Sequence, residues 1–486
     1  MTNKTHPNHP SASRRAFLRT ASLLSLAGTA GAPFALNLAT IGAAAAQTAP
    51  SDYKALVCLF MNGGNDSFNT VLATDPTSWA EYLRLRGSAD NGAIALPAAG
   101  SAGGVLPIVP KTAQAGRSFA LHPNLQELTG IFGAGRLAVV SNVGPLVMPA
   151  TREQYLARSV QFPQKLFSHN DQQSLWQSSM PEGAKSGWGG RMGDLLVAAN
   201  STPIFTAISV SGNAVFLAGQ AINQYQITGA GAVPINGLSG SLFGSSAAAN
   251  PLQAIISSDR SNLFEKEHAA VVRRSIAAQS LLATGLVPAG AAGIPNPTQY
   301  NSPRRGGLAN NSLAVQLQTV ARVIASRGAL GAKRQVFFVN MGGFDTHDDQ
   351  NARHADLMAR LGHAMAYFDG VLGNLQGADL RNQVTLFTAS DFGRTFASNG
   401  DGTDHGWGGH HFVMGGAVRG QDIVGAFPVT GIGHAQDVGG GSLLPQFSVD
   451  QYGATLASWF GLSATQVGQV FPGLANFTTK NLGFMT

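Results

Sequence analysis

A continuous apolar run of strand length, Leu56-Val57-Cys58-Leu59-Phe60, is followed closely by the turn-forming stretch Asn62-Gly63-Gly64-Asn65-Asp66. Consecutive apolar residues, rather than an alternation of apolar and polar ones, are typical of a strand that is covered on both faces. The two glycines allow the backbone to turn sharply and to bring Asp66 to the end of the strand. This stretch therefore predicts a buried strand that leads into a polar loop.

Three similar apolar runs follow, at residues 137–141, 336–340 and 384–388. Between the last two, apolar residues recur on one face of a helical period: Leu357, Leu361, Ala364, Phe368, Leu372 and Leu375. A strand, a helix and a second strand form a right-handed crossover, so the two strands are parallel and the loops after them emerge at one edge of the sheet. We predict an α/β fold with a mainly parallel central sheet covered by helices on both faces.

The region from about residue 203 to residue 303 differs in composition from the rest of the chain. It is rich in Gly, Ala, Ser and Asn, and residues 229–250 carry no charge. We interpret it as an insertion into one large domain of residues 47–486, with a helix expected near residues 261–282. The uncharged tract is either a surface loop or a lid, because composition does not separate the two.

The first 46 residues have the pattern of a targeting signal. Two adjacent arginines, Arg14 and Arg15, precede a moderately apolar stretch that ends in Ala44-Ala45-Ala46. Glycine, serine and threonine dilute this stretch, which falls short of the roughly 20 consecutive apolar residues that cross a membrane. We predict a twin-arginine signal peptide cleaved after Ala46, export by the twin-arginine translocase to the periplasm or beyond, and a mature form without a stable membrane span.

The charge balance of the expected mature chain is close to neutral. Removal of the signal takes four basic residues and no acidic ones, which leaves 27 basic and 25 acidic residues. Without a basic face that carries interleaved aromatic residues, nucleic acid is not an expected partner. Cys58 is the only cysteine, so no disulfide can form within the chain.

Polar residues that bind metals gather directly after the predicted strands. Besides Asp66, they form three clusters: Asp345 with His347, Asp391 with Arg394, and His405 in the run 404–411. Because parallel strands present their following loops together, these clusters should converge at one sheet edge. Carboxylate and imidazole ligands together suit zinc, with manganese or iron as alternatives. We predict a divalent metal site formed by Asp66, Asp345, His347, Asp391 and His405, although Asp66 could equally serve a turn.

Two residues are candidates for direct participation in catalysis. Ser168 precedes a helical segment, where a helix N-terminus would favour an anion or a developing alkoxide. Its alternative role is to cap that helix. Arg394 has the forked geometry that pairs with an anionic oxygen, and its alternative role is structural.

Taken together, the motifs resemble a known family. They are a twin-arginine leader followed by Met-Asn-Gly-Gly-Asn-Asp (61–66), Ser-His-Asn-Asp-Gln-Gln (168–173), Gly-Gly-Phe-Asp-Thr-His (342–347), Ser-Asp-Phe-Gly-Arg-Thr (390–395) and Asp-His-Gly-Trp-Gly-Gly-His-His (404–411). This combination is similar to the domain of unknown function 1501 family, which looks like a branch of the alkaline phosphatase and sulfatase superfamily. The resemblance spans Tyr53 to Phe477.

The resemblance implies roles for individual residues. Asp66 resembles the metal-binding aspartate after the first strand of the superfamily, and Ser168 lies where its nucleophile would be expected. Asp345 with His347, then Asp391, then His405 resemble the later ligand groups. Asp345 and His347 are two residues apart rather than four, and Phe392 rather than a histidine follows Asp391. These departures put a complete two-metal set in question, and the Cys/Ser-x-Pro-x-Arg pattern of formylglycine sulfatases is missing at Cys58 and at Ser168.

The resulting expectation is an exported, metal-dependent hydrolase of phosphate or related esters, acting on a small anionic ester. A non-enzymatic exported protein for binding or envelope assembly is the first alternative, because the ligand spacings depart from the superfamily. A hydrolase of sulfate esters or of another ester is the second, because metal ligands do not specify the reacting centre.

Overall fold

In the computed structural model, the described residues are 52–87, 93–238, 241, 244–245, 247 and 249–486. The predicted signal peptide therefore lies outside the described residues. Among the described helices, none is long and apolar enough to cross a membrane.

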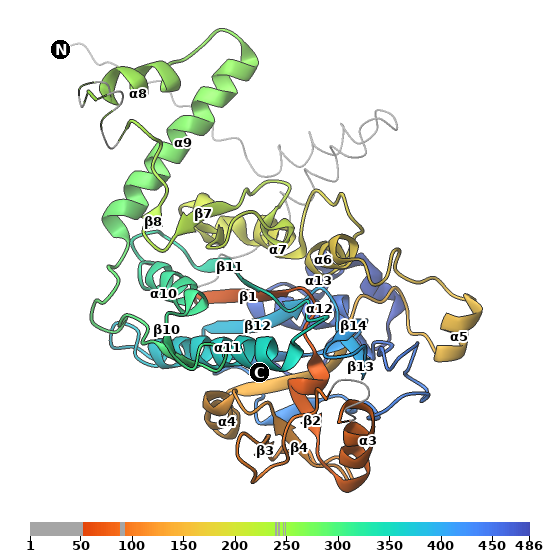
Figure 1. Ribbon diagram of the computed structural model, residues 1–486. Helices are drawn as coiled ribbons and strands as arrows, with labels where there is room; N and C mark the ends of the chain where they lie inside the picture. Colours follow the sequence, from red (N-terminus) through yellow and green to blue (C-terminus); the bar gives the residue numbers. More distant parts are fainter. Residues whose placement is uncertain (1–51, 88–92, 239–240, 242–243, 246, 248) are drawn as a thin grey trace, which may run out of the picture. The chain divides into compact units, whose positions relative to one another are not determined.

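A large sheet runs through the centre of the described chain (Figure 1). Its strands lie in the order β16-β5-β15-β12-β1-β11-β6-β7-β8, and β17 also pairs with β5. In that order the bounds are β16 Asp422–Val424, β5 Leu137–Gly144, β15 Gly409–Met414, β12 Val384–Ser390, β1 Lys54–Asn62, β11 Arg334–Gly342, β6 Ala207–Ser209, β7 Tyr225–Thr228, β8 Gly231–Ala232 and β17 Phe447–Ser448.

The centre of this sheet is parallel, as the sequence predicts. Strand β1 pairs with β11 from Lys54↔Arg334 to Asn62↔Gly342, and with β12 from Ala55↔Val384 to Met61↔Ser390. Antiparallel pairs join β15 to its neighbours β12 and β5. The four apolar runs predicted as strands correspond to β1, β5, β11 and β12.

Helices cover both faces of the sheet. Helices α4, α10 and α11 pack on one face, and α6, α7, α12 and α13 on the other. Their bounds are α4 Gln126–Gly133, α6 His169–Ser178, α7 Trp188–Leu196, α10 Ser312–Ala325, α11 Gln350–Leu372, α12 Val449–Phe460 and α13 Ala464–Val470.

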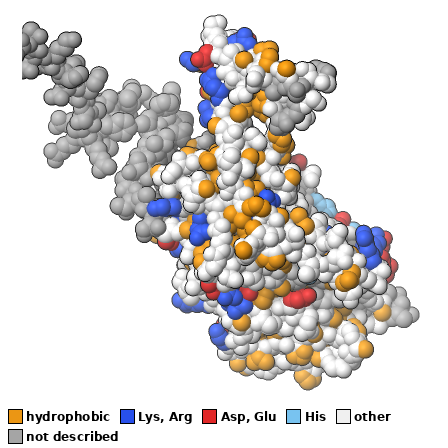
Figure 2. Space-filling view, turned by 90° about the vertical axis from the view of Figure 1, so that its left-hand side faces the viewer, with side chains coloured by type: hydrophobic (Ala, Val, Ile, Leu, Met, Phe, Trp, Pro, Cys, Tyr) orange, Lys and Arg blue, Asp and Glu red, His pale blue; other side chains and the backbone are white. Residues whose placement is uncertain are grey.

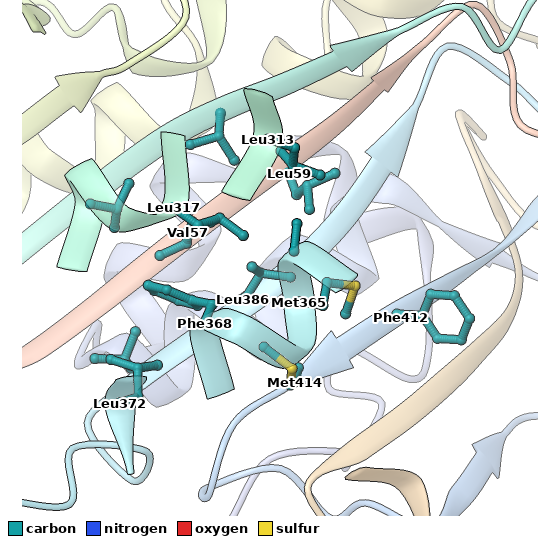
Figure 3. Packing of buried hydrophobic residues seen from close by; sticks show 14 of the residues in the cluster. Val57, Leu59, Leu313, Leu317, Met365, Phe368, Leu372, Leu386, Phe412 and Met414 are labelled. Atoms are coloured by element: carbon teal, nitrogen blue, oxygen red, sulfur yellow. The ribbon is translucent and has the colours of Figure 1, made fainter. Parts of the chain in front are cut away.

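Alternate residues of β1 enter two separate cores. Val57 and Leu59 belong to the cluster with α10 and α11, whereas Cys58 and Phe60 belong to the cluster on the other face. Figure 3 shows the first cluster, where Phe368 of α11 lies close to Leu386 of β12. Burial on both faces is the physical reason for the uninterrupted apolar sequence of β1.

Smaller elements surround the sheet. They are β2 Val71–Ala73, α3 Pro76–Arg86, β3 Leu106–Ile108, β4 Phe119–Leu121, α5 Arg152–Ala157, β9 Tyr300–Ser302, β10 Gly307–Ala309, β13 Arg394–Ser398 and β14 Thr403–His405, with short 3-10 helices at Ser67–Asn69, Val197–Ala199, Pro203–Phe205, Val215–Leu217 and Pro472–Asn476.

One part of the region predicted as an insertion belongs to the sheet, and another part extends away from it. Its strands β6, β7 and β8 extend the sheet beyond β11, and α8 (Ala249–Ser257) and α9 (Leu263–Gly285) lead away from it. Helix α9 is close to the predicted range of 261–282. Hydrophobic side chains are exposed on this pair of helices (Figure 2), with Leu263 and Phe264 the most exposed.

Four buried histidines predict acid sensitivity. Burial lowers the pKa of His354 to about 4 and those of His410 and His411 to about 3, and it also lowers the pKa of His122. These histidines stay neutral in the folded chain, whereas in the unfolded chain they take up protons below their ordinary pKa of about 6.5. Stability is therefore present above pH ~6.5 and is lost as the pH falls from there toward 4.

We expect the free energy of unfolding, measured by denaturant titration, to fall steadily over that pH range. His411→Asn should weaken the pH dependence by about one proton, while His268→Asn, at an exposed position on α9, should leave it unchanged. A stability that does not change between pH 6.5 and pH 4 would contradict this prediction.

Candidate metal centre

The metal-binding residues predicted after β11 and β12 lie at one edge of the sheet, because both strands run parallel to β1. The loop after β1 packs closely against the loop that carries Asp345. Gly63 has a φ of 115°, and a Cβ at this position would lie 2.4 Å from the backbone nitrogen of Asp345. Glycine at position 63 thus permits both the turn and the close approach of the two loops.

Asp345 lies at the centre of three histidines. Its Oδ1 atom is 3.0 Å from Nε2 of His347 and 3.3 Å from Nε2 of His405. Its Oδ2 atom is 3.3 Å from Nε2 of His169. The Nε2 atoms of His347 and His405 are 3.0 Å apart. One carboxylate and three imidazole nitrogens therefore face one another.

In each of these histidines the other ring nitrogen is held by an oxygen. Nδ1 of His169 lies 2.7 Å from Oδ2 of Asp391, and Nδ1 of His405 lies 2.7 Å from the carbonyl oxygen of Phe167. Nδ1 of His347 lies 3.3 Å from Oδ1 of Asp404. A carbonyl or a carboxylate can only accept, so a neutral ring whose Nδ1 donates to this oxygen keeps its free lone pair on Nε2. This is the arrangement that orients histidine ligands toward a metal.

The spacing of these atoms fits a divalent metal ion. Ligands about 2.0–2.2 Å from a tetrahedral zinc ion are separated from one another by roughly 3.3–3.5 Å, and the contacts around Asp345 are 3.0–3.3 Å. Among the described residues, ligand atoms of His169, Asp345 and His405 all lie within 4.8 Å of one another. Imidazole with carboxylate suits zinc, manganese or iron. This group could therefore hold such an ion.

The surroundings shift the pKa values of the candidate ligands in different directions. Burial alone would raise the pKa of Asp345, but the hydrogen bond and charge of Arg394, together with the nearby histidines, lower it. Burial is also the main cause that lowers the pKa of His405. The hydrogen bond that His169 donates to Asp391 raises the pKa of His169, because the carboxylate stabilises the protonated ring. Asp345 is thus ionised and His405 neutral near pH 7.

Arg394 contacts the carboxylate of Asp345, the candidate ligand at the centre of the group. Its side chain is fully buried, and Nη1 donates to Oδ1 of Asp345 over 2.6 Å. It also donates to the carbonyl oxygen and the hydroxyl of Thr403. In this structure Arg394 therefore orients Asp345, while its proposed contact with an anionic oxygen stays a prediction.

Asp391 and Asp66 are placed differently from Asp345. Oδ2 of Asp391 accepts from His169 and from Gln173, so Asp391 contacts a candidate ligand, and its Oδ1 has no protein partner. Asp66 is fully buried, and Arg86 and Gln350 donate to its carboxylate. The structure does not bring Asp66 into contact with the histidines.

Ser168 lies at the N-cap position of α6, but its side chain makes no capping hydrogen bond. Its hydroxyl donates to Oδ2 of Asp171 over 2.9 Å. The preceding residue, Phe167, has a φ of 71° and Lys165 a φ of 49°. Such left-handed conformations are costly for these residue types, and here they direct the Phe167 carbonyl at His405.

His169 is a candidate ligand that was not predicted from the sequence. It stands between Ser168 and Asn170 in the motif singled out for a nucleophile, and it is the first residue of α6. The available signal was a histidine beside a proposed catalytic serine. The contact of α6 with the sheet edge, which brings His169 to Asp345, is tertiary and leaves no local pattern.

Asp391→Asn is expected to lower metal affinity by about 10- to 100-fold, as the loss of a partner behind a ligating histidine does. A neutral amide at this position cannot supply the charge that orients Nδ1–H of His169. The matched control is Asp404→Asn, because Asp404 is exposed and its contact with His347 is longer, so its effect should be smaller. Competition of each variant with a metal-binding dye measures both affinities, and equal losses would contradict the proposed role of Asp391.

The described chain is thus an α/β protein whose mostly parallel sheet presents a histidine and aspartate group at the end of its central strands, which is consistent with an alkaline-phosphatase-like fold. Residues 266–460 match the model of a family described as "Protein of unknown function (DUF1501)". This match includes Asp345, His347, Asp391 and His405, whereas His169 lies outside it.

Two further comparisons complete these findings. No curated protein matches the sequence. One similar solved structure comes from work on "Metabolism of multiple glycosaminoglycans by bacteroides thetaiotaomicron"; it is 9% identical, has a TM-score of 0.34, and covers 86% of this chain and 75% of that chain. This likeness is too distant to indicate an activity.

Proposed function

We propose that the chain is a metal-dependent hydrolase of phosphate or related esters, exported by the twin-arginine pathway to the periplasm or beyond. The observation that supports this function is the convergence of three Nε2 atoms on the carboxylate of Asp345, with each Nδ1 held by an oxygen. Such a preorganised set of ligands binds zinc, manganese or iron.

A divalent ion bound there would polarise the ester and lower the pKa of a bound water molecule. Other groups of the protein position the candidate ligands. Asp391 and the Phe167 carbonyl orient the rings of His169 and His405, and Arg394 holds Asp345 in place. The candidate ligand side chains are between 24% and 42% exposed, so a small substrate can reach them.

The first experiment is metal analysis of the mature protein, purified from the periplasm without chelators or a metal column. We expect zinc, manganese or iron in stoichiometric amount and hydrolysis of at least one member of a panel of p-nitrophenyl phosphate mono- and diesters and sulfate esters. Protein that contains no metal and takes up none on titration would contradict the proposal and favour the non-enzymatic alternative. Metal without turnover on any ester would also count against hydrolysis.

Ser168 is proposed as the attacking group, with Asp171 as the acceptor of its proton. Its hydroxyl already donates to the Asp171 carboxylate, which is the arrangement that activates a serine. We expect Ser168→Ala to reduce turnover by about 100-fold or more and to leave the metal content unchanged. Unchanged turnover would assign the attack to water. Ser179→Ala, at the other end of α6, is the control.

A further inference from the structure

The carboxylate of Asp66 is fully enclosed by hydrogen-bond donors. Oδ2 accepts from Nη1 of Arg86 and from Nε2 of Gln350, each over 2.6 Å. Oδ1 accepts from Nη2 of Arg86 and from the backbone nitrogen of Phe68, each over 3.1 Å. Both side chains of the Asp66–Arg86 pair are 0% exposed. No oxygen of Asp66 is left to face a metal ion.

Arg86 is fixed just as completely. Beyond its contacts with Asp66, it donates to Asn69 and to the backbone carbonyls of Thr395 and Phe396. Its guanidinium lies 5.3 Å from the ring centroid of Phe68 and 5.1 Å from that of Phe396. These contacts fix the position of a positively charged side chain beside Asp66.

The rest of the sheet edge offers no second set of ligands. Among the described residues, the group of His169, Asp345 and His405 is the only one with three or more ligand atoms close enough to share an ion. Oδ2 of Asp391 already accepts from His169 and Gln173, so Oδ1 is the one oxygen of Asp391 without a partner. A second ion would need three or four protein ligands, and without Asp66 they are not assembled.

We infer that the centre binds one metal ion per chain, and that the Arg86 guanidinium supplies, as a fixed part of the fold, the positive charge that a second ion would bring to Asp66. This inference rests on the metal centre of the proposed function. On this inference Asp66, which the sequence predicts as a ligand, is not one: its carboxylate instead links the loop after β1 to α3 and to the start of α11.

The centre would then contain one exchangeable cation, the metal ion, and one permanent cation, the guanidinium of Arg86. A pair of metal ions could clamp both the attacking and the leaving oxygen of an ester. Here only an ion held beside Asp345 could contact the substrate, because Arg86 is buried and its donors are engaged. Negative charge that develops on the other reacting oxygen of the ester must therefore be stabilised by side chains or backbone groups of the chain.

The test is a titration of the metal-free mature protein with Co²⁺, followed by its absorption in the visible range and checked by elemental analysis. We expect a break at one equivalent per chain in the wild type. Asp66→Asn should keep that break and its absorption spectrum, with an affinity within about 3-fold of the wild type, whereas His405→Ala should weaken it by about 100-fold or more.

Two equivalents in the wild type, or the loss of one equivalent in folded Asp66→Asn, would overturn the inference and leave the proposed function intact. No bound metal in the wild type would overturn both. If Asp66→Asn does not fold, the double variant Asp66→Asn/Arg86→Met replaces the whole ion pair by neutral groups and is titrated in its place. The wild-type stoichiometry tests the inference by itself.

Discussion

Asp345→Asn is expected to abolish both metal binding and ester hydrolysis. The carboxylate of Asp345 contacts all three histidines, and Arg394 donates to the same carboxylate. Asparagine keeps an oxygen for Arg394 but loses the negative charge, and it can place an amide group against Nε2 of His169. Loss of a partner behind a ligand costs about 10- to 100-fold in affinity, so loss of this central ligand should cost more than about 100-fold.

The measurements are the metal content after dialysis and the turnover of the best ester from the panel. Asparagine is preferable to alanine, because alanine would also leave the buried Arg394 without an acceptor oxygen at position 345. Asp348→Asn is the control, since Asp348 is exposed and pairs with Arg353 rather than with the histidines. A folded Asp345→Asn protein that retains its metal would place the metal centre elsewhere.

Much of the fold follows from the apolar runs of the sequence. The runs that became β1, β11 and β12 lack polar alternation because helices cover both of their faces, and this burial also makes them easy to recognise. The parallel arrangement then places Asp345, which follows β11, and Asp391, which follows β12, at one edge. The strands β6 to β8 were not foreseen, because they are short and lie in a stretch whose composition resembles a loop.

The parts of the site that escaped prediction depend on contacts between distant segments. His169 reaches Asp345 only because α6 crosses the ends of the strands, and the two residues are far apart in the chain. Asp66 resembled a ligand because it follows a buried strand, as Asp345 does. Its partner Arg86 is the last residue of α3, where an arginine is expected on a solvated helix end, and nothing in the local sequence marks it as buried.

Arg86→Met is expected to destabilise the fold by about 3–5 kcal/mol, which is the usual cost of removing one partner of a buried ion pair. Methionine fills part of the space between Phe68 and Phe396 but leaves the carboxylate of Asp66 buried with an uncompensated charge. It also leaves the carbonyls of Thr395 and Phe396 without their donor. The free energy of unfolding, measured by denaturant titration near pH 7, gives this cost.

The same helix provides a matched control. Arg84 lies two residues away and pairs with Glu81 at the surface, where an ion pair contributes little. Arg84→Met should therefore leave stability nearly unchanged. An equal loss in the two variants would mean that the cost comes from the helix and not from the buried pair.

The double variant Arg86→Met/Asp66→Asn separates the charge from the packing. If the uncompensated carboxylate causes most of the loss, making residue 66 neutral should recover a large part of it, because the two substitutions act on one contact and are not additive. The amide at position 66 can still accept from Gln350 and from the backbone of Phe68, so those bonds survive. A double variant less stable than Arg86→Met alone would show that Asp66 stabilises the fold without Arg86, and the pair would then not be the unit that replaces a second metal ion.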